Sequence, residues 1–408
     1  MGRTTLITRF VAPIAVVALG LGASGAASAA GAAPAKAPSQ AKSDVIIGNI
    51  SNATGSGLPS DGAFKTVQAW AKDVNSRGGV NGHKIVVKTA DDKADPAKAS
   101  EAMKSLIDAG AIAIVGQYAG GTSTVWLPIA DQAKVPVIGG GCYGVDEIGD
   151  QNYFCVTTTA ILDGLYAQAK FAADQGGKKF GITYDSAQPQ AAAAAPLMKG
   201  ASTKYGLQFT DGLGVSNTQP DYTATCVTFK QSGTTDVGIE GAPQLPNLAR
   251  DCARQGYSPK WTSGDGQISL NSWLKDPNIK EAIAAIYSFP YMDTSTPATK
   301  RFNSVMKKYA PSVLKSDYKQ PATTTWTAAI AFEKALQKVT SDNPTADDVT
   351  NALNTFSGET LDGLAPNPIT FTAGQDHPHN SCWFSMVLKN HKLTEPNGMK
   401  TTCTPANG

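Results

Sequence analysis

The chain has 408 residues, of which 41 % are hydrophobic and 17 % are charged. This length exceeds what one ordinary domain needs, and the composition supplies enough apolar mass for two cores, which excludes a largely disordered chain. The first 29 residues hold two arginines and no acids, so the remainder has 33 basic and 33 acidic residues. Such a balance gives no electrostatic reason to bind nucleic acid or an anionic membrane. We therefore expect a small solute as partner.

The chain begins with the pattern of an export signal. Arg3 and Arg9 precede an apolar run over 11–21, and Ala27-Ser28-Ala29 is a small-residue cleavage pattern. The run is shorter than the roughly 20 residues that a membrane span needs. We expect residues 1–29 to be a signal peptide cleaved near Ala29 and residues 30–43 to be a flexible linker rich in Ala, Pro, Lys and Ser. No cysteine lies near the cleavage site to carry a lipid, so a secreted or otherwise extracytoplasmic protein is predicted, at the cell surface or in the periplasm.

From residue 44 onward, short β-branched runs alternate with helical patterns, which is typical of βαβ units and a parallel sheet. Asp95 is placed to cap a helix, and Pro96 suits its first turn. A doubly wound lobe is complete by about residue 157. The predicted strands are 45–50, 83–89, 111–115 and 135–139, and the predicted helices are 62–77, 96–109 and 121–133.

The alternation then starts again and predicts a second lobe of the same architecture. Strands are predicted over 179–184, 207–211, 236–240, 259–263 and 283–288, with helices over 161–174, 191–205 and 246–255. Further helices are predicted over 297–309, 322–339 and 343–356, and a hairpin with arms 382–388 and 393–403 turns around 389–392.

Six cysteines lie in the exported part of the chain, where an even number indicates disulfides. Their spacings of 13, 26 and 21 residues form three local pairs. A zinc site is the weaker interpretation, because there is no C-x-x-C and the only close histidines are His377 and His379. We predict no metal and the pairs Cys142–Cys155, Cys226–Cys252 and Cys382–Cys403.

One stretch carries a resemblance to a known family. The run Gly78-Gly79-Val80-Asn81-Gly82-His83-Lys84-Ile85 leads from a helix through a glycine turn into a strand that ends at Asp91-Asp92, and Asp95-Pro96 follows. This run resembles the branched-chain amino acid binding proteins of ABC transporters, the leucine/isoleucine/valine-binding family with the type I periplasmic-binding fold. The motif itself needs only a turn with positive φ. Adjacent strand residues point to opposite faces, which argues against a catalytic carboxylate pair at Asp91 and Asp92.

The resemblance implies the fold class α/β, with two doubly wound Rossmann-like lobes joined by a three-strand hinge. The element order matches from about residue 44 to about residue 356. We expect the chain to cross between lobes near Thr158, Phe289 and Phe356. Lobe 1 then comprises 44–157 and 290–356, and lobe 2 comprises 158–289 and 357–408 with the C-terminal hairpin.

The resemblance also implies a ligand between the lobes, at the carboxyl ends of strands and the amino ends of helices. In the amino acid binders, Ser and Thr at these loops hold the ligand carboxylate, whereas Gly120 and Gly121 stand at two such positions here. Tyr143 likewise replaces a small hydroxyl residue. The expected ligand-binding residues of lobe 1 are Leu58, Tyr118, Gly120, Gly121, Thr122, Gly141 and Tyr143. Simple packing is the alternative role for Leu58 and for both tyrosines.

In lobe 2 the expected ligand-binding residues are Asp185, Glu240 and Asp265. Asp265 matches the segment whose carboxylate takes the ligand ammonium in the amino acid binders, and a helix cap is its alternative role. A carboxylate facing an ammonium group is a charge-assisted contact worth roughly 1.5–3 kcal/mol. An α-amino acid is therefore one candidate ligand, and aromatic or amide-like solutes fit the tyrosines and glycines equally well.

The function that this pattern predicts is capture of a small organic solute and its delivery to an ABC transporter permease, by a monomer without a cofactor. No G-x-S-x-G elbow, P-loop or spaced metal ligand set is present, so we do not expect an enzyme. The alternative is a free sensing or scavenging protein of the same fold, with an aromatic or amide-type ligand.

Overall fold

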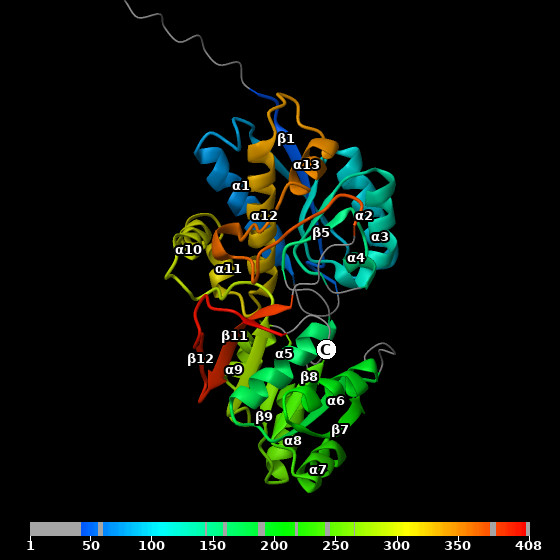
Figure 1. Ribbon diagram of the computed structural model, residues 1–408, viewed down its shortest axis with the longest axis vertical. Coiled ribbons are helices and arrows are strands. Elements are labelled where there is room, and N and C mark those ends of the chain that lie inside the picture. The colour runs from blue at the N-terminus through cyan, green and yellow to red at the C-terminus, as the bar shows by residue number, and fades with distance from the viewer. Residues whose placement is uncertain are drawn as a thin grey trace, which may run out of the picture. The chain divides into compact units, whose positions relative to one another are not determined.

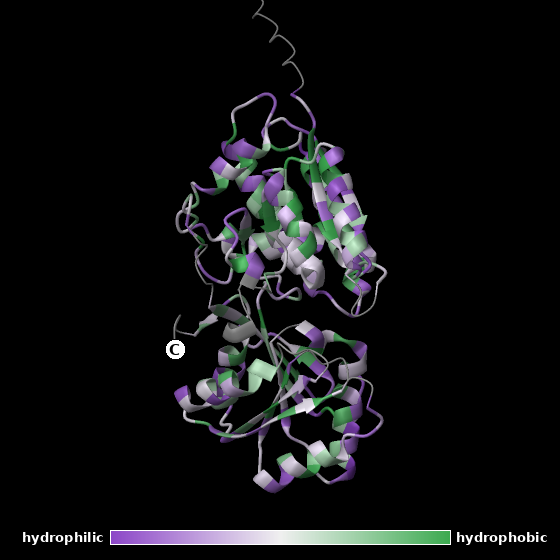
Figure 2. Ribbon diagram, turned by 90° about the vertical axis from the view of Figure 1, so that its right-hand side faces the viewer, coloured by the Kyte–Doolittle hydropathy of each residue, from purple (hydrophilic) through white to green (hydrophobic). Residues whose placement is uncertain are grey.

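A computed structural model describes residues 42–55, 60–142, 145–157, 161–186, 192–216, 219–240, 245–264, 266–375 and 381–404 (Figure 1). Two sheets organise these residues, and each sheet with its flanking helices is called a lobe below. Figure 2 shows mainly hydrophobic strands in the first sheet and helices with both hydrophilic and hydrophobic residues. Amphipathic helices on a buried parallel sheet are the layered arrangement that alternating β and α patterns predict.

The first sheet has the order β2-β1-β3-β4-β5, with every neighbouring pair parallel. This order places β1 and β3 side by side, and their carboxyl ends form one edge. Asp95 caps the second helix by accepting the N–H of Lys98, as predicted. The elements of this part are β1 (Val45–Ser51), α1 (Asp61–Ser76), β2 (Ile85–Asp91), α2 (Pro96–Asp108), β3 (Ile114–Gln117), α3 (Ser123–Gln132), β4 (Val137–Gly139), α4 (Val145–Ile148) and β5 (Tyr153–Cys155).

The second sheet has the order β12-β11-β10-β9-β8-β6-β7, and β13 pairs with β11. Strands β6 to β10 are parallel to their neighbours among themselves, whereas β11 runs antiparallel to β10. Its elements are α5 (Ile161–Asp174), β6 (Lys179–Asp185), α6 (Ala194–Lys204), β7 (Gln208–Val215), α7 (Thr223–Ser232), β8 (Asp236–Glu240), α8 (Leu245–Arg254), β9 (Lys260–Ser263), α9 (Asn271–Leu274), β10 (Glu281–Ile286), β11 (Cys382–Lys389), β12 (Lys392–Thr394) and β13 (Thr402–Cys403).

Between β10 and β11 the chain returns to the first lobe. It forms α10 (Pro297–Tyr309), α11 (Pro311–Lys315), α12 (Gln320–Lys338) and α13 (Ala346–Leu353). Helix α12 is buried along most of its length and contacts β3 and β4 as well as α1. Gly116 makes this close approach feasible, because a Cβ there would lie 2.6 Å from a side-chain carbon of Thr325. The long helix therefore fixes the end of β3, where a candidate loop begins.

The glycine turn that carries the resemblance has the predicted strained backbone. Gly78 and Gly79 have φ values of 99° and 82°. A Cβ on Gly79 would lie 2.1 Å from the carbonyl oxygen of His83, and this approach closes the small bridge between Val80 and His83. The motif is thus a structural turn between α1 and β2.

The segment after Phe356 packs on the first lobe rather than the second. Glu359 pairs with Ile369, Lys334 of α12 binds Glu359, and the ring of Phe371 contacts the ring of Phe154 at 5.1 Å. The ion pair holds the segment against α12, and the ring contact holds it against β5. We therefore propose the third crossing after Phe371, later than the predicted position near Phe356.

The C-terminal hairpin differs from prediction in its second arm. The predicted strand 393–403 is divided into β12 and β13, because Pro396 has no N–H for a ladder and Gly398 takes a φ of 50°. All three predicted disulfides are formed, at Cys142–Cys155, Cys226–Cys252 and Cys382–Cys403. The last of them ties β13 to the start of β11.

The loop after β12 holds a carboxyl group whose titration should change stability. Glu395 accepts the N–H of Met292 at 3.0 Å, and burial, with a smaller contribution from Asp293, raises the pKa of Glu395 to about 7. The folded chain therefore binds this proton more tightly than the unfolded chain does. As pH rises from about 4.5 through 7, this group should lower the free energy of unfolding by on the order of 2 kcal/mol.

Urea unfolding of the mature protein at pH 5 and pH 8 checks this expectation. Glu395→Gln should reduce the pH-dependent loss, because its amide does not ionise. Glu101→Gln is the matched control, since Glu101 is exposed and pairs with Lys98 on the helix surface. An identical pH dependence in the wild type and in Glu395→Gln would contradict the assignment.

Candidate functional site

The carboxyl ends of β1 and β3 are joined by a buried polar side chain. The amide of Asn49 donates to the carbonyls of Val115 and Gly116, both at 2.7 Å, and its oxygen accepts from Ser51 Oγ. The N–H of Tyr118 in turn donates to the carbonyl of Ile50 and to Ser51 Oγ. These bonds satisfy buried carbonyls at the strand ends and set the start of the candidate loop 118–122.

The hydroxyls at the amino end of α3 bind protein carboxylates. Thr122 Oγ1 lies 2.7 Å from Asp92 Oδ2, and Ser123 Oγ lies 2.7 Å from Asp146 Oδ2. Burial, with a smaller contribution from Asp91, raises the pKa of Asp92, although its bond from Thr122 opposes that change. Thr122 stays a predicted ligand residue, but in this structure its hydroxyl binds Asp92.

Asp91 and Asp92 bind different parts of the chain, as their positions on a strand predict. Asp91 accepts the backbone N–H groups of Ala53 and Lys93 and the hydroxyl of Thr54. Burial is the largest single effect and raises the pKa of Asp91, but these bonds together outweigh it, so the pKa is lowered. The two carboxylates therefore serve separate loops.

Three tyrosine hydroxyls converge beside the candidate loop. The hydroxyl of Tyr118 lies 3.0 Å from that of Tyr287 and 2.8 Å from that of Tyr318. Tyr287 follows β10, where the chain crosses between lobes, and Tyr318 precedes α12. Tyr118 was predicted as a site residue, whereas the other two were not. The position of Tyr287 beside the predicted crossing was the available signal, and Tyr318 had none.

Gly141 and the second-lobe acids lie at strand ends. The carbonyl of Gly141 accepts from Gln117 Nε2 at 3.0 Å and from the hydroxyl of Tyr153, and Gly141 stays a predicted ligand residue. Asp185 ends β6 and is 3 % exposed, and Glu240 ends the neighbouring strand β8. Because these strands are parallel neighbours, both acids lie at the carboxyl-terminal ends of the strands, on the same side of the sheet.

Gly120 and Gly121 begin a 3-10 turn that leads into α3. A Cβ on Gly121 would meet no atom within 4 Å, so this backbone faces open space. Leu58, Tyr143 and Asp265 lie outside the described residues. The structure therefore brings Tyr118, Gly120, Gly121 and Thr122 together on one loop, and places Asp185 near Glu240 on the other sheet.

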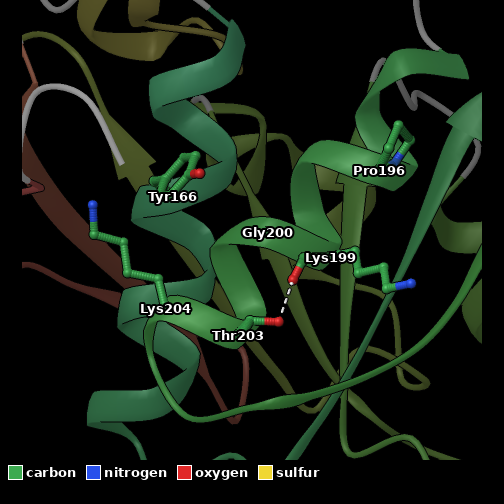
Figure 3. A pocket seen from close by; sticks show the side chains of 6 residues that line it. All are labelled: Tyr166, Pro196, Lys199, Gly200, Thr203 and Lys204. Atoms are coloured by element: carbon green, nitrogen blue, oxygen red, sulfur yellow. Dashed lines mark hydrogen bonds between the residues drawn. The ribbon is translucent and has the colours of Figure 1, made fainter.

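A surface groove of about 690 Å³ lies between α5 and α6 (Figure 3). Tyr166, Pro196, Lys199, Gly200, Thr203 and Lys204 line it. The Lys199 and Lys204 side chains point away from each other in Figure 3, and Thr203 donates to the Lys199 carbonyl within the helix. The Lys204 ammonium lies 5.2 Å from the centroid of the Tyr166 ring. We keep the strand-end edges as the candidate site.

The described residues contain no helix that is long and apolar enough to cross a membrane. Within the same ranges, no group of three or more His, Cys, Asp or Glu side chains could hold a metal ion. The predicted His377 and His379 loop lies outside those ranges.

Comparison with known families identifies the fold's relatives. The family model described as periplasmic binding protein matches residues 44–392, most of the chain. The chain belongs to this periplasmic binding protein family. The predicted resemblance and fold class are thereby confirmed.

Proteins named as amino acid binders are similar in sequence to this periplasmic binding protein. An "Amino acid binding protein" of Pseudomonas aeruginosa is 25 % identical over 234 residues, 56 % of this chain and 62 % of that protein. "Leu/Ile/Val-binding protein homolog 2" of Brucella abortus is 26 % identical over 230 residues, 55 % of this chain and 62 % of that protein. The matched region thus spans less than two thirds of these relatives.

Solved structures confirm the fold over more of the chain. A branched-chain amino acid ABC transporter protein from Thermus thermophilus with bound valine has a TM-score of 0.71 at 18 % identity, covering 90 % of this chain and 98 % of its own. A fatty acid ABC transporter substrate-binding protein from Thermomonospora curvata has a TM-score of 0.66 at 18 % identity, covering 86 % and 91 %. At these identities the likeness establishes the fold, and the two titles name different solutes.

Proposed function

We propose that this periplasmic binding protein captures a small organic solute between its lobes and delivers it, unchanged, to the permease of an ABC importer. The observation that carries the proposal is the arrangement of the parallel strands, β1 to β5 in the first sheet and β6 to β10 in the second. In each, loops that follow adjacent strands lead into helix amino ends, where free N–H groups and dipoles bind polar ligand groups. The relatives named for amino acid binding support the solute class.

The side chains at the strand ends also agree with delivery of an unchanged solute rather than with catalysis. Asp91 and Asp92 are each engaged by backbone or hydroxyl donors of separate loops. The Thr122 and Ser123 hydroxyls donate to carboxylates and have no histidine or lysine partner among the bonds that the described residues make. We propose that the protein is extracytoplasmic, monomeric and without a cofactor.

A thermal-shift screen of the mature protein tests the proposal. Candidate solutes are amino acids, amides, amines, sugars, and aromatic and fatty acids, because a ligand that binds only the folded state raises the melting temperature. We expect at least one solute to stabilise the protein and to be recovered chemically unchanged after incubation. Conversion of a stabilising solute, or stabilisation by none of these classes, would count against the proposal.

Asp265 remains the proposed partner for a ligand ammonium group. Asp265→Asn keeps the size of the side chain but removes its charge, so it should weaken binding of an ammonium-bearing solute about tenfold or more. Isothermal titration with the stabilising solute measures the change, with Asp276→Asn as a control in the turn before β10. Unchanged affinity in Asp265→Asn would remove Asp265 from the site while leaving the importer proposal intact.

A further inference from the structure

Basic residues are nearly absent from the loops that form the candidate edges. In the sequence, the segments between the ends of β1 to β10 and the next helix contain a single Lys and no Arg or His. That residue, Lys93, follows the edge strand β2. Acids are frequent there, although the mature chain has equal numbers of acidic and basic residues. The acids at strand ends or in these segments are Asp91, Asp92, Asp95, Asp185, Asp221, Glu240, Asp265 and Asp293.

Protein carboxylates also occupy the position where this fold offers an anion its best contacts. Thr122 precedes α3, and Ser123 is its first residue. The nearest acceptor of each hydroxyl proton is a carboxylate 2.7 Å away, and a backbone carbonyl of the same loop lies at 3.0 Å from Thr122 Oγ1 and 2.9 Å from Ser123 Oγ. The amino end of a helix carries a partial positive charge that favours an anion. Here Asp92 and Asp146 already neutralise it, so a ligand carboxylate would meet two like charges and no uncommitted hydroxyl proton from Thr122 or Ser123.

The backbone of the same loop is partly committed as well. The N–H of Ala119 donates to Gln117 Oε1 at 2.7 Å, and the N–H of Thr122 donates to the carbonyl of Ala119. Two N–H groups from glycines, at Gly120 and Gly121, remain at the turn. A ligand carboxylate would have to accept its hydrogen bonds from these two N–H groups. It would also be repelled by Asp92, which is 1 % exposed, so that water screens its charge little.

The second lobe also presents acidic side chains at its strand ends. Asp185 is 3 % exposed at the end of β6, and Glu240 lies at the end of β8. On the first-lobe loop, the half-buried ring of Tyr118, whose hydroxyl bonds to two other tyrosine hydroxyls, adds an aromatic surface of the kind that attracts cations. A positively charged group is therefore favoured from both sheets.

We propose that the solute is an organic cation, an amine without a carboxylate, rather than an α-amino acid. This inference rests on the proposed function, since it names the chemical class that the same site takes. The carboxylates supply charge-assisted bonds to an ammonium group. The hydroxyls of the first-lobe loop bind Asp92 and Asp146 instead of a ligand carboxylate.

Isothermal titration with solutes that share one skeleton tests the proposal. For the leucine skeleton these are L-leucinamide, L-leucine and 4-methylpentanoate. For the phenylalanine skeleton they are 2-phenylethylamine, L-phenylalanine and 3-phenylpropanoate, and butane-1,4-diamine is added. We expect at least one amine to bind, at least tenfold more tightly than the amino acid of its skeleton, and no acid to bind at millimolar concentration.

Charge variants locate the effect. Glu240→Gln should weaken amine binding about tenfold, whereas Asp174→Asn, at the exposed last residue of α5 and outside the strand-to-helix segments, should not. Equal melting temperatures of the free variants would show that both fold. The inference is overturned if an amino acid or an acid binds more tightly than its matched amine, or if no amine binds. Tight leucine binding would leave the importer proposal standing, whereas a full solute screen without any ligand would defeat both.

Discussion

Trp326→Ala is expected to lower the free energy of unfolding of the first lobe by about 3–5 kcal/mol, because it removes a large side chain from a packed core. Trp326 is fully buried in α12. Its ring contacts Phe302 edge to face at 5.4 Å, and Phe302 contacts Phe289 in the same way at 5.1 Å. The guanidinium of Arg301 lies 5.6 Å from the Trp326 ring centroid. The cavity would therefore open where α10, α12 and the second crossing meet.

Denaturant unfolding, followed by far-ultraviolet circular dichroism, measures this loss. Met292→Ala is the control, since Met292 is 38 % exposed and lies on the same crossing segment. Its truncation should change stability by less than about 0.5 kcal/mol. Similar losses in the two variants would contradict the packing described for α12.

Loss of the Cys226–Cys252 bond is expected to cost about 3–4 kcal/mol, the second largest effect. Both half-cystines are fully buried, and the bond joins residues 26 positions apart across part of α7, all of β8 and most of α8. In the chain-entropy account, the cross-link stabilises by restricting the unfolded chain, and more so for longer loops. The buried sulfurs add packing between α7 and α8 in the second lobe.

The double variant Cys226→Ala/Cys252→Ala isolates this bond. Its melting temperature should fall further than that of Cys382→Ala/Cys403→Ala, because Cys403 is exposed and β13 has only two residues. Comparison of each variant with the wild type under non-reducing conditions provides the measurement. A larger loss in the Cys382/Cys403 pair would show that the terminal strand matters more than the second-lobe core.

Local signals predicted much of the fold because they act within a few residues. Asp95 and Thr345 accept N–H groups of the helices that follow them, as capping residues do. The three cysteine pairs were also readable from spacing. By contrast, α7 was missed, since its sequence TATCVTFKQS is rich in β-branched residues of low helix propensity. Packing of Cys226 and Phe229 into the core overrides that preference.

The candidate site was predictable as a set of loops but not as a set of contacts. Thr122 and Asp92 are 30 residues apart, and Tyr118 and Tyr318 are 200 residues apart. Such partners are decided by how β2, β3 and α12 pack, which no local pattern reports. The ligand-binding role of the loop around Tyr118 stays a prediction, and the structure adds that Thr122 and Ser123 bind protein carboxylates.

The central claim is that two lobes close on a solute, and small-angle X-ray scattering of the mature protein tests it most directly. Profiles are recorded without solute and with a saturating amount of the best stabilising solute. Hinged closure should reduce the radius of gyration reversibly, with recovery after dialysis. An unchanged radius of gyration at saturation, together with confirmed binding, would contradict the proposal that capture proceeds by closure of the lobes.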